Sequence, residues 1–513
     1  MDSQKYDAVK IDKAAASLIK RRKTLEKLQK LAKKNEVGLE NLPENVKLAI
    51  NDTGLHAIFL KDALIRYRIC SSEISTQNSG KAEIQSLAFD REKLARAYPE
   101  ASKIFMDGYG IDELRLKCLI EGADAETVHS LEDIRSAMNS FWDLVQWVKN
   151  NKTNTKSYKT NQHIYAENLW MVSKWNSIKS DLINELLEYK FNHAAIRLIK
   201  FISGDVGTVY IRFLNGLKHD YEDQTTFLSA EYVMKQLCAY MSYFAPSISI
   251  CAYYELKDRS DILTLIRPSV DRSLINKYLE DRMEKTIKLA SEINSTRPSL
   301  GIPGDVPISQ VILPNVTKDS IEESALKRMT SVIEIGYNIN EDDFSIELNT
   351  LQLNSTYSQM EVTKIIGKFL ELTKGTILRN LVNGLEISAD GKKYNIPIKD
   401  VKLKPLKQNM HVINSDLSKI IINTEMNENS KREWIKKEVI SSIERIREEM
   451  GIKSGSLIRF NIRFSDPYEK ELDENALKEV GLAVNGELSE SGRLLRIQNL
   501  NIDRYTIIIS VFK

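Results

Sequence analysis

The chain contains few of the residues that build metal and redox centres. Only four of its 513 residues are cysteines, and none stands in a C-x-x-C pair. Neither a zinc knuckle nor a redox dithiol is therefore indicated, and we expect buried thiols and no metal. The chain also lacks the roughly 18 to 20 uninterrupted apolar residues of a membrane helix and the apolar core of a secretory signal. These absences predict a cytoplasmic protein without membrane contact.

Residue patterns of nucleotide chemistry are also missing. None of the six histidines stands in a His-Ile-Gly-His-like context, and we expect them at surface or capping positions. Residues Gly301 to Gly304 enclose prolines and lack the lysine and hydroxyl of a phosphate-binding loop. No nucleophile motif points to a serine, histidine and acid triad. We therefore predict no catalytic residue and no cofactor in this chain.

Positive charge is concentrated at the N-terminus. The formal net charge is only +2, yet residues 1–34 hold eleven Lys and Arg against four acids. Apolar residues in this arm recur at helical spacings of three, four and seven: Ile11, Ala14, Leu18, Leu25, Leu28 and Leu31. The spacing of these apolar residues and the many lysines and arginines therefore predict a basic amphipathic helix over residues 1–38. Three aspartates in the first twelve residues argue against a mitochondrial presequence.

Further along, periodicity predicts a multidomain chain with an all-α part followed by α+β parts. After residue 38 we expect five segments. Residues 39–95 are unassigned, and residues 96–150 form a short segment before an all-helical domain at 151–265. A small α/β module at 266–350 and an α+β module at 351–513 follow. Expected helices are Gly54–Cys70, Asp133–Asn150, Gln359–Phe369 and Lys431–Met450, besides several between His163 and Asp258, one closed by Pro246. Expected strands are Ile308–Leu313, Phe344–Leu348, Lys419–Asn423, Leu457–Phe464 and Tyr505–Phe512.

One stretch carries a family resemblance. Residues 98–120 contain Tyr98, Pro99, Tyr109, Gly110, Asp112, Leu114, Arg115 and Leu116 in the order Y-P…Y-G-x-D-x-L-R-L. This order resembles the strand and helix that follow the catalytic signature of class I isoleucyl-tRNA synthetases of the eukaryotic and archaeal type. The resemblance implies a Lys-Met-Ser-Lys-Ser-like loop just upstream, where this chain has Arg91–Arg96. We therefore expect the catalytic loop to be lost.

The helical block resembles the anticodon-binding bundle of the same family. Residues 169–178, 189–201 and 241–246 are similar to its helices, and residues 282–290 and 433–447 are similar to its C-terminal part. The resemblance implies an anticodon-binding bundle over 151–265, C-terminal α+β modules, and a remnant of the stem-contact region over 96–150. One departure is that Phe213–Gly216 stands where the family has a basic run. Fewer phosphate contacts mean weaker RNA binding.

The resemblance suggests candidate RNA-binding residues, because anticodon recognition stacks unpaired bases on aromatic rings. Trp170 and Lys174 on the first bundle helix are such candidates, although the spacing of Trp170 and Trp175 also fits core positions. Tyr210 and Arg212 match the residues of the family pattern at these positions, and the resemblance implies that Arg212 faces the RNA. In the basic arm the candidates are Lys20, Arg21, Arg22 and Lys23, for which a solvated helix face is the alternative.

Three functional hypotheses remain open at the level of the sequence. The chain is a noncatalytic synthetase-like protein that binds tRNA or tRNA-like RNA, or the tRNA-binding half of a split isoleucine-tRNA ligase whose catalytic domain is a partner protein. Alternatively, it is a protein scaffold that has lost RNA affinity. The basic arm favours RNA, and the lost basic run favours the scaffold. No pattern indicates DNA.

Overall fold

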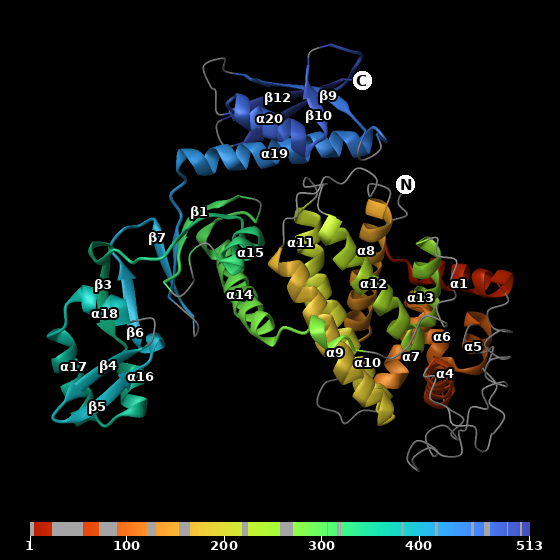
Figure 1. Ribbon diagram of the computed structural model, residues 1–513, viewed down its shortest axis with the longest axis horizontal. Helices are drawn as coiled ribbons and strands as arrows, with labels where there is room; N and C mark the ends of the chain where they lie inside the picture. The colour runs from red at the N-terminus through yellow and green to blue at the C-terminus, as the bar shows by residue number, and fades with distance from the viewer. Residues whose placement is uncertain are drawn as a thin grey trace. The chain divides into compact units, whose positions relative to one another are not determined.

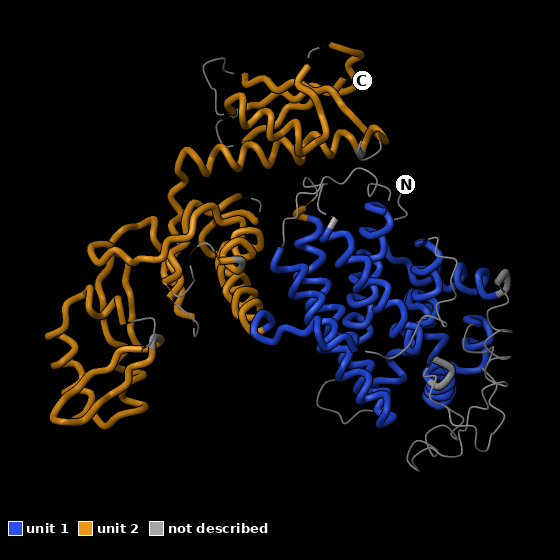
Figure 2. Tube along the Cα trace, viewed as in Figure 1, with its two compact units in different colours: residues 1–215, 221–280 blue, residues 216–220, 281–513 orange. Residues whose placement is uncertain are grey.

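The structure, a computed structural model, describes residues 5–22, 55–70, 90–121, 130–152, 165–217, 224–256 and 270–512. The last range has gaps at 305, 315–317, 319, 381–383, 416–418, 453–455, 466–471, 490 and 503–504. The chain divides into two compact units, coloured blue and orange in Figure 2. The first comprises residues 1–215 and 221–280, and the second residues 216–220 and 281–513. The finer boundaries predicted from the sequence stay predictions.

Helices build the described part of the first unit (Figure 1). They are α1 (Ala8–Arg22), α4 (Leu55–Cys70), α5 (Arg91–Ala97), α6 (Pro99–Met106), α7 (Ile111–Ile120), α8 (Leu131–Asn151), α9 (Ala166–Leu187), α10 (Phe191–Phe201), the π-helix η3 (Ile202–Tyr210), α11 (Ile211–Gly216), α12 (Gln224–Phe244), α13 (Pro246–Glu255), the 3-10 turn η5 (Arg272–Leu274) and the first turn of α14 (Lys277–Thr296). The helices predicted at 54–70, 133–150 and within 163–258 are confirmed where the chain is described.

Two local predictions in this unit are wrong. Residues 98–120 contain no strand, because Pro99 occupies the first turn of α6, where its missing N–H is not needed. Gly108, with φ of 83°, then turns the chain toward α7. Pro246 does not close a helix but begins α13, after α12 has ended at Phe244.

Helix α1 packs against α13 through a narrow apolar face. Its buried apolar residues are Ala8, Ile11, Ala15, Leu18 and Ile19. Ala14, which the sequence assigned to this face, is exposed, because the contact follows positions 8, 11, 15, 18 and 19 instead. The continuation predicted through Leu25, Leu28 and Leu31 lies outside the described residues. The first half of the basic arm is thus an integral part of the helical unit.

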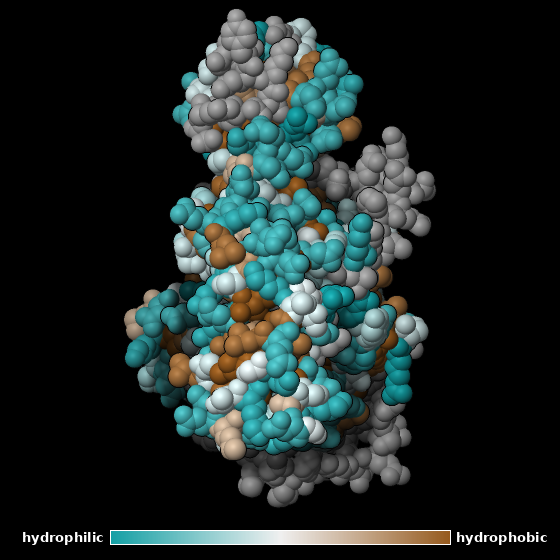
Figure 3. All heavy atoms as spheres, turned by 90° about the vertical axis from the view of Figure 1, so that its left-hand side faces the viewer, coloured by the Kyte–Doolittle hydropathy of each residue, from teal (hydrophilic) through white to brown (hydrophobic). Residues whose placement is uncertain are grey.

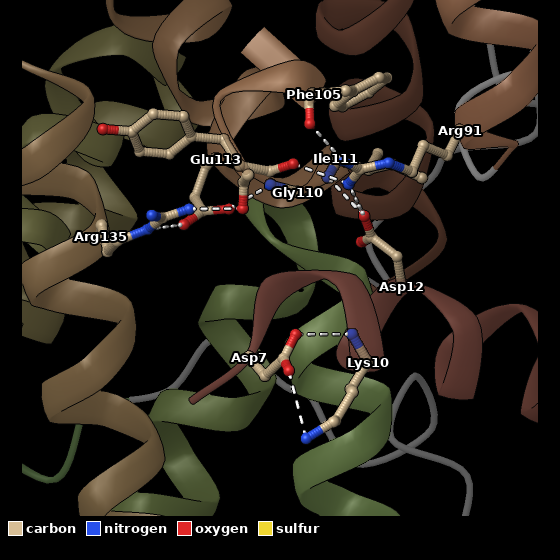
Figure 4. A network of polar contacts seen from close by, with 11 residues as sticks. Asp7, Lys10, Asp12, Arg91, Phe105, Gly110, Ile111, Glu113 and Arg135 are labelled. Atoms are coloured by element: carbon tan, nitrogen blue, oxygen red, sulfur yellow. Dashed lines mark hydrogen bonds and ion pairs between the residues drawn. The ribbon is translucent and has the colours of Figure 1, made fainter. Parts of the chain in front are cut away.

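A polar network fastens α1 to the beginning of α7 (Figure 4). The backbone N–H of Ile111 donates to Asp12 Oδ2 at 3.0 Å, and Arg91 Nη1 donates to the same oxygen at 3.2 Å. Arg91 also donates to the carbonyl oxygens of Phe105 and Tyr109, at 2.8 and 2.7 Å. Arg91, which stands where the resemblance implies the lost catalytic loop, lies in helix α5 and joins α1 and α6 to the turn that precedes α7.

The second unit combines helices with small sheets. After α14 come the 3-10 turn η6 (Pro298–Leu300), β1 (Ile308–Ile312), α15 (Ile321–Thr330), β2 (Val332–Gly336), η7 (Glu341–Asp343), β3 (Phe344–Leu348), α16 (Thr350–Thr356), α17 (Gln359–Leu370), α18 (Lys374–Asn380), β4 (Leu385–Ala389), β5 (Lys392–Ile396), η8 (Ile398–Asp400), β6 (Val401–Pro405), β7 (Met410–Asn414), β8 (Lys419–Asn423), α19 (Glu428–Glu449), β9 (Ile458–Phe464), α20 (Glu474–Ala483), β10 (Gly486–Leu488), β11 (Leu494–Ile502) and β12 (Tyr505–Phe512). The five strands predicted from sequence are confirmed as β1, β3, β8, β9 and β12.

Three hydrophobic cores organise this unit. One lies between the sheet β2-β1-β8-β7 and helices α14 and α15, and includes Leu289, Leu326 and Ile420. A second joins α16, α17 and α18 to the pairs β3-β6 and β4-β5. The third lies between the sheet β10-β9-β12-β11 and helices α19 and α20. Each sheet is therefore stabilised by helices packed on it, as small sheets require.

Some large apolar side chains reach the surface of the module that contains α16 and α17. Leu351, Met360 and Leu370 are 82%, 71% and 77% exposed. Figure 3 shows brown hydrophobic patches within a mostly teal surface on the side of the chain that includes this module. Single exposed apolar residues are common on soluble proteins, so these three carry no functional assignment.

Candidate nucleic-acid interface

The π-helix η3 and the short helix α11 form one continuous segment that contains Arg212. π-Helices usually occur as single turns and are frequent at functional sites, whereas η3 spans nine residues. Gly207 allows it to approach α8, because a Cβ on Gly207 would lie 2.2 Å from Ser140 Oγ and 2.9 Å from Ser140 Cβ. The approach fixes the position of the segment that precedes Arg212.

Arg212 is exposed, in contrast to the residues after it. Phe213 and Leu214 are 6% and 0% exposed, and the Phe213 ring lies 5.5 Å from Tyr165 and 5.8 Å from Tyr210, between centroids. Basic side chains at 213 and 214 would therefore have to enter an apolar core. Phe213 and Leu214 are therefore core residues, and Arg212 is the exposed cation of residues 202–216.

Tyr210 and Trp170 serve the core in this structure. Both are 0% exposed. The Tyr210 hydroxyl donates to Asn168 Oδ1 at 3.0 Å, and Asn168 Nδ2 donates to Thr226 Oγ1 at 2.6 Å, which links η3, α9 and α12. Neither ring offers a face to a base, because stacking needs an accessible π surface. Trp175, 0% exposed as well, packs against Phe201 and Tyr240.

The other candidate RNA-binding residues lie on two helices: Lys174 on α9, and Lys20, Arg21 and Arg22 at the end of α1. Lys174 is half-buried on α9. Lys20, Arg21 and Arg22 form the last residues of α1, and their side chains are not described; Lys23 lies outside the described residues. The structure thus brings Trp170, Lys174, Tyr210 and Arg212 into one bundle. The basic cluster of α1 belongs to a different helix.

Three described cations of the bundle, Arg197, Lys190 and Lys235, are matched by acids. Arg197 contacts Glu185 at 2.6 Å and Asp181 at 3.1 Å, Lys190 contacts Glu188 at 2.7 Å, and Lys235 contacts Glu231 at 3.0 Å. Arg212 and Lys200 are exposed and form no ion pair with a described residue. These two side chains are therefore the bundle cations that can meet a phosphate without first giving up a described acid.

An acid at the start of α14 was missed by the sequence reasoning. Buried Glu280 accepts hydrogen bonds from Ser173 and, at 2.7 Å, from Ser177 on α9, and pairs with Lys277 at 2.9 Å. Burial alone would raise its pKa, but these hydrogen bonds bring the pKa of Glu280 below its ordinary value. The contact presents Tyr278, 70% exposed, beside Lys277. The adjacent Lys277 and Tyr278 were the sequence signal that could have marked this position as a candidate RNA contact.

Within the described residues, no three His, Cys, Asp or Glu side chains gather as a metal site. No described helix is long and apolar enough to cross a membrane. Of the cysteines, Cys238 and Cys251 are buried and Cys118 is half-buried, while the side chain of Cys70 lies outside the description.

Comparison with known proteins finds a similar domain that includes this bundle. Residues 168–313 match the anticodon-binding domain of tRNA ligase. The chain is similar to isoleucine–tRNA ligases. The enzyme of Methanococcus aeolicus is 24% identical over 77% of this chain, and that of Methanocaldococcus jannaschii is 24% identical over 79%. A valine–tRNA ligase of Prochlorococcus marinus is 24% identical over 43% of this chain and is covered over 26% of its own length.

The similarity to isoleucine–tRNA ligases is partial on their side. The chain spans 39% and 40% of the two archaeal enzymes. The matched anticodon-binding domain contains Trp170, Lys174, Tyr210 and Arg212, whereas Lys20 to Lys23 precede it.

Proposed function

We propose that the chain binds tRNA, or an RNA that resembles it, through the helical bundle. The observation that carries this proposal is the match of residues 168–313 to the anticodon-binding domain of tRNA ligase. On this bundle Arg212, exposed and without an ion pair to a described residue, is our choice for a phosphate contact, with Lys200 as a second. Trp170 and Tyr210 support the bundle from within and take no direct part.

The basic end of α1 adds electrostatic attraction in this proposal. Lys20, Arg21, Arg22 and Lys23 follow directly on the part of α1 that is packed against α13. A docked helix holds its charges near the bundle at little further entropic cost, whereas a loose arm would have to be ordered on binding. We further propose that residues 1–513 form no aminoacyl-adenylate by themselves, and that any ligase activity requires a catalytic domain outside these residues.

The test is tRNA binding by the full chain at two salt concentrations. Each phosphate contact contributes about 0.7 to 0.9 to the slope of log affinity against log salt. Arg212→Ala should weaken binding and reduce that slope by about one contact. Arg96→Ala is a matched control, because Arg96 is an exposed arginine on α5, outside the matched domain, and already faces Glu92 at 3.6 Å. Equal effects of the two variants would contradict the proposed site.

A scaffold function is the second candidate, and the ion pairs of Arg197, Lys190 and Lys235 favour it. A surface whose charges are internally neutralised has less to gain from a polyanion. Absence of tRNA binding even at low salt, with the protein folded, would support the scaffold and exclude the RNA proposal.

A further inference from the structure

The four-stranded sheet near the C-terminus is covered by helices on one face. Ile458 and Phe460 of β9 and Ile507 and Ile509 of β12 point into the core that α19 and α20 close. Figure 1 shows α19 running along the sheet. Because side chains alternate along a strand, the residues between these project to the opposite face. Among them Arg459 and Arg463 are exposed.

The strand register places these outward residues in rows. Arg459 is opposite Phe512, and Arg463 is opposite Ile508, which is itself opposite Asn499 of β11. Between these rows Asn461 faces Ser510, and Ser510 faces Ile497. Directly opposed residues have Cβ atoms about 4.5 to 5.5 Å apart. The face therefore combines an aromatic ring, apolar side chains, amides and two guanidinium groups within one small surface.

The charge of this face has one sign along the three long strands. The sequences of β9, β11 and β12 contain three arginines and no Asp or Glu. The third, Arg496, belongs to the helix-covered side, where it contacts Glu449 of α19 at 3.3 Å. Among the described strand residues, Glu487 of the short edge strand β10 is the acid in register with this face, opposite Arg459. The open side thus carries two exposed arginines against one acid, a net positive charge that favours an anion.

We propose that this open face binds a strand of unpaired RNA. Unpaired nucleotides offer phosphates to arginines, flat bases to aromatic rings and polar edges to amides, and open sheets with this combination are suited to read them. Phe512 provides the ring, Arg459 and Arg463 contact the phosphates, and Asn461 and Asn499 contact base edges. A folded protein partner would gain less, because it would have to supply acids spaced to match both arginines on a flat, polar surface.

The experiment uses the full chain and a fluorescent oligouridylate, which has no base pairs, in a polarisation titration at two salt concentrations. The double variant Arg459→Ala and Arg463→Ala should lower affinity by about tenfold or more and flatten the salt slope by about 1.4, at 0.7 per contact on a single strand. Phe512→Leu keeps an apolar side chain but removes the stacking ring, and should lower affinity by about tenfold.

Arg496→Ala is the matched control, since it removes an arginine of the same sheet from the opposite side. Circular dichroism spectra that match the unsubstituted chain establish that each variant is folded. Oligouridylate binding unchanged in the double variant, or lost equally in Arg496→Ala, overturns the inference, as does absence of binding at low salt.

This inference rests on the proposed function only in that RNA is the class of ligand, and the two fail separately. Loss of tRNA affinity in Arg212→Ala with unchanged oligouridylate affinity in the double variant would leave the bundle proposal standing alone. Unchanged tRNA affinity in Arg212→Ala with reduced oligouridylate affinity in the double variant would support the sheet as the RNA site and contradict the bundle proposal.

Discussion

The helical bundle and the C-terminal sheet use similar residues in opposite ways. In the bundle, Trp170 and Tyr210 are buried, and Arg197, Lys190 and Lys235 are paired with acids. In the sheet, Arg459 and Arg463 are exposed on the open face, where Phe512 lies opposite Arg459, and Arg496 on the helix-covered side contacts an acid of α19. The lesson is that similarity to a known domain locates a candidate site, whereas burial decides which side chains can reach a ligand.

The largest expected effect distinguishes a core tryptophan from a stacking one. Trp170→Ala should destabilise the first unit by about 3 to 5 kcal/mol, because it removes a large, fully buried side chain and leaves a cavity. Urea unfolding followed by circular dichroism measures this, and Trp170→Phe should cost less because it fills more of the space. A Trp170→Ala protein of unchanged stability that has lost tRNA affinity would show that the ring faces RNA.

A second effect concerns the approach of η3 to α8. Gly207→Ala should destabilise the bundle by about 1 to 3 kcal/mol, since the added methyl group would overlap Ser140. Gly204→Ala, in the same π-helix, is the control, because its Cβ would meet nothing within 4 Å. Thermal unfolding of the two variants should separate them, and equal melting temperatures would contradict the close approach.

The pH dependence of stability should report on the docking of α1. Burial, followed by the nearby Asp112 carboxylate, raises the pKa of Asp12 to about 7 from 3.8, against the opposing hydrogen bond from Ile111 and the charge of Arg91. The folded state therefore holds a proton that the unfolded state loses, and this group's contribution to stability falls as pH rises from about 4 to about 7.

Asp12→Asn should remove that fall, so that its stability relative to the unsubstituted chain improves by about 1 kcal/mol per pH unit within this window. Asp112, whose pKa burial raises to about 6, keeps its own dependence of the same sign in both proteins. Asp7→Asn is the control, because the Lys10 backbone N–H lowers the pKa of the exposed Asp7. Parallel stability curves for Asp12→Asn and the unsubstituted chain between pH 4 and 7 would be inconsistent with this account.

The smallest predicted effect is that of the basic end of α1 on the salt dependence of tRNA binding. Substitution of Lys20, Arg21, Arg22 and Lys23 by Gln preserves the packed half of α1, whereas deletion of residues 1–34 would also remove Ile11 and Asp12 from the fold. The tRNA salt slope should decrease by up to about 3, at 0.7 to 0.9 for each phosphate that these side chains neutralise. An unchanged slope would mean that these side chains face solvent in the complex.

The sequence predicted the elements with strong periodicity, including α8 and the strands β1, β3 and β12. It did not predict β4 to β7, of which β5 and β6 contain two lysines each and therefore show little of the apolar character of a buried strand. Placement of single side chains was harder. Helical periodicity put Ala14 on the buried face, although the true contact line depends on where α13 lies.

Long-range contacts of the candidate site could not be predicted from local pattern. Asp12 meets Ile111 across ninety-nine residues, and Glu280 meets Ser173 across more than a hundred. The sequence pattern identified Arg212, which the structure leaves exposed, but it could not say that Phe213 and Leu214 would be core residues. The Phe213 ring packs on Tyr165 and Tyr210, which only the fold brings together.

The most direct test of the account compares two halves of one tRNA. Affinities of the full chain for an isolated anticodon stem-loop and for an acceptor-stem minihelix of similar charge can be measured by fluorescence polarisation at the same salt concentration. Binding through an anticodon-binding bundle predicts higher affinity for the stem-loop, and a reduction of that affinity by Arg212→Ala. Equal affinities for both RNAs, or a preference for the acceptor stem, would contradict the central claim.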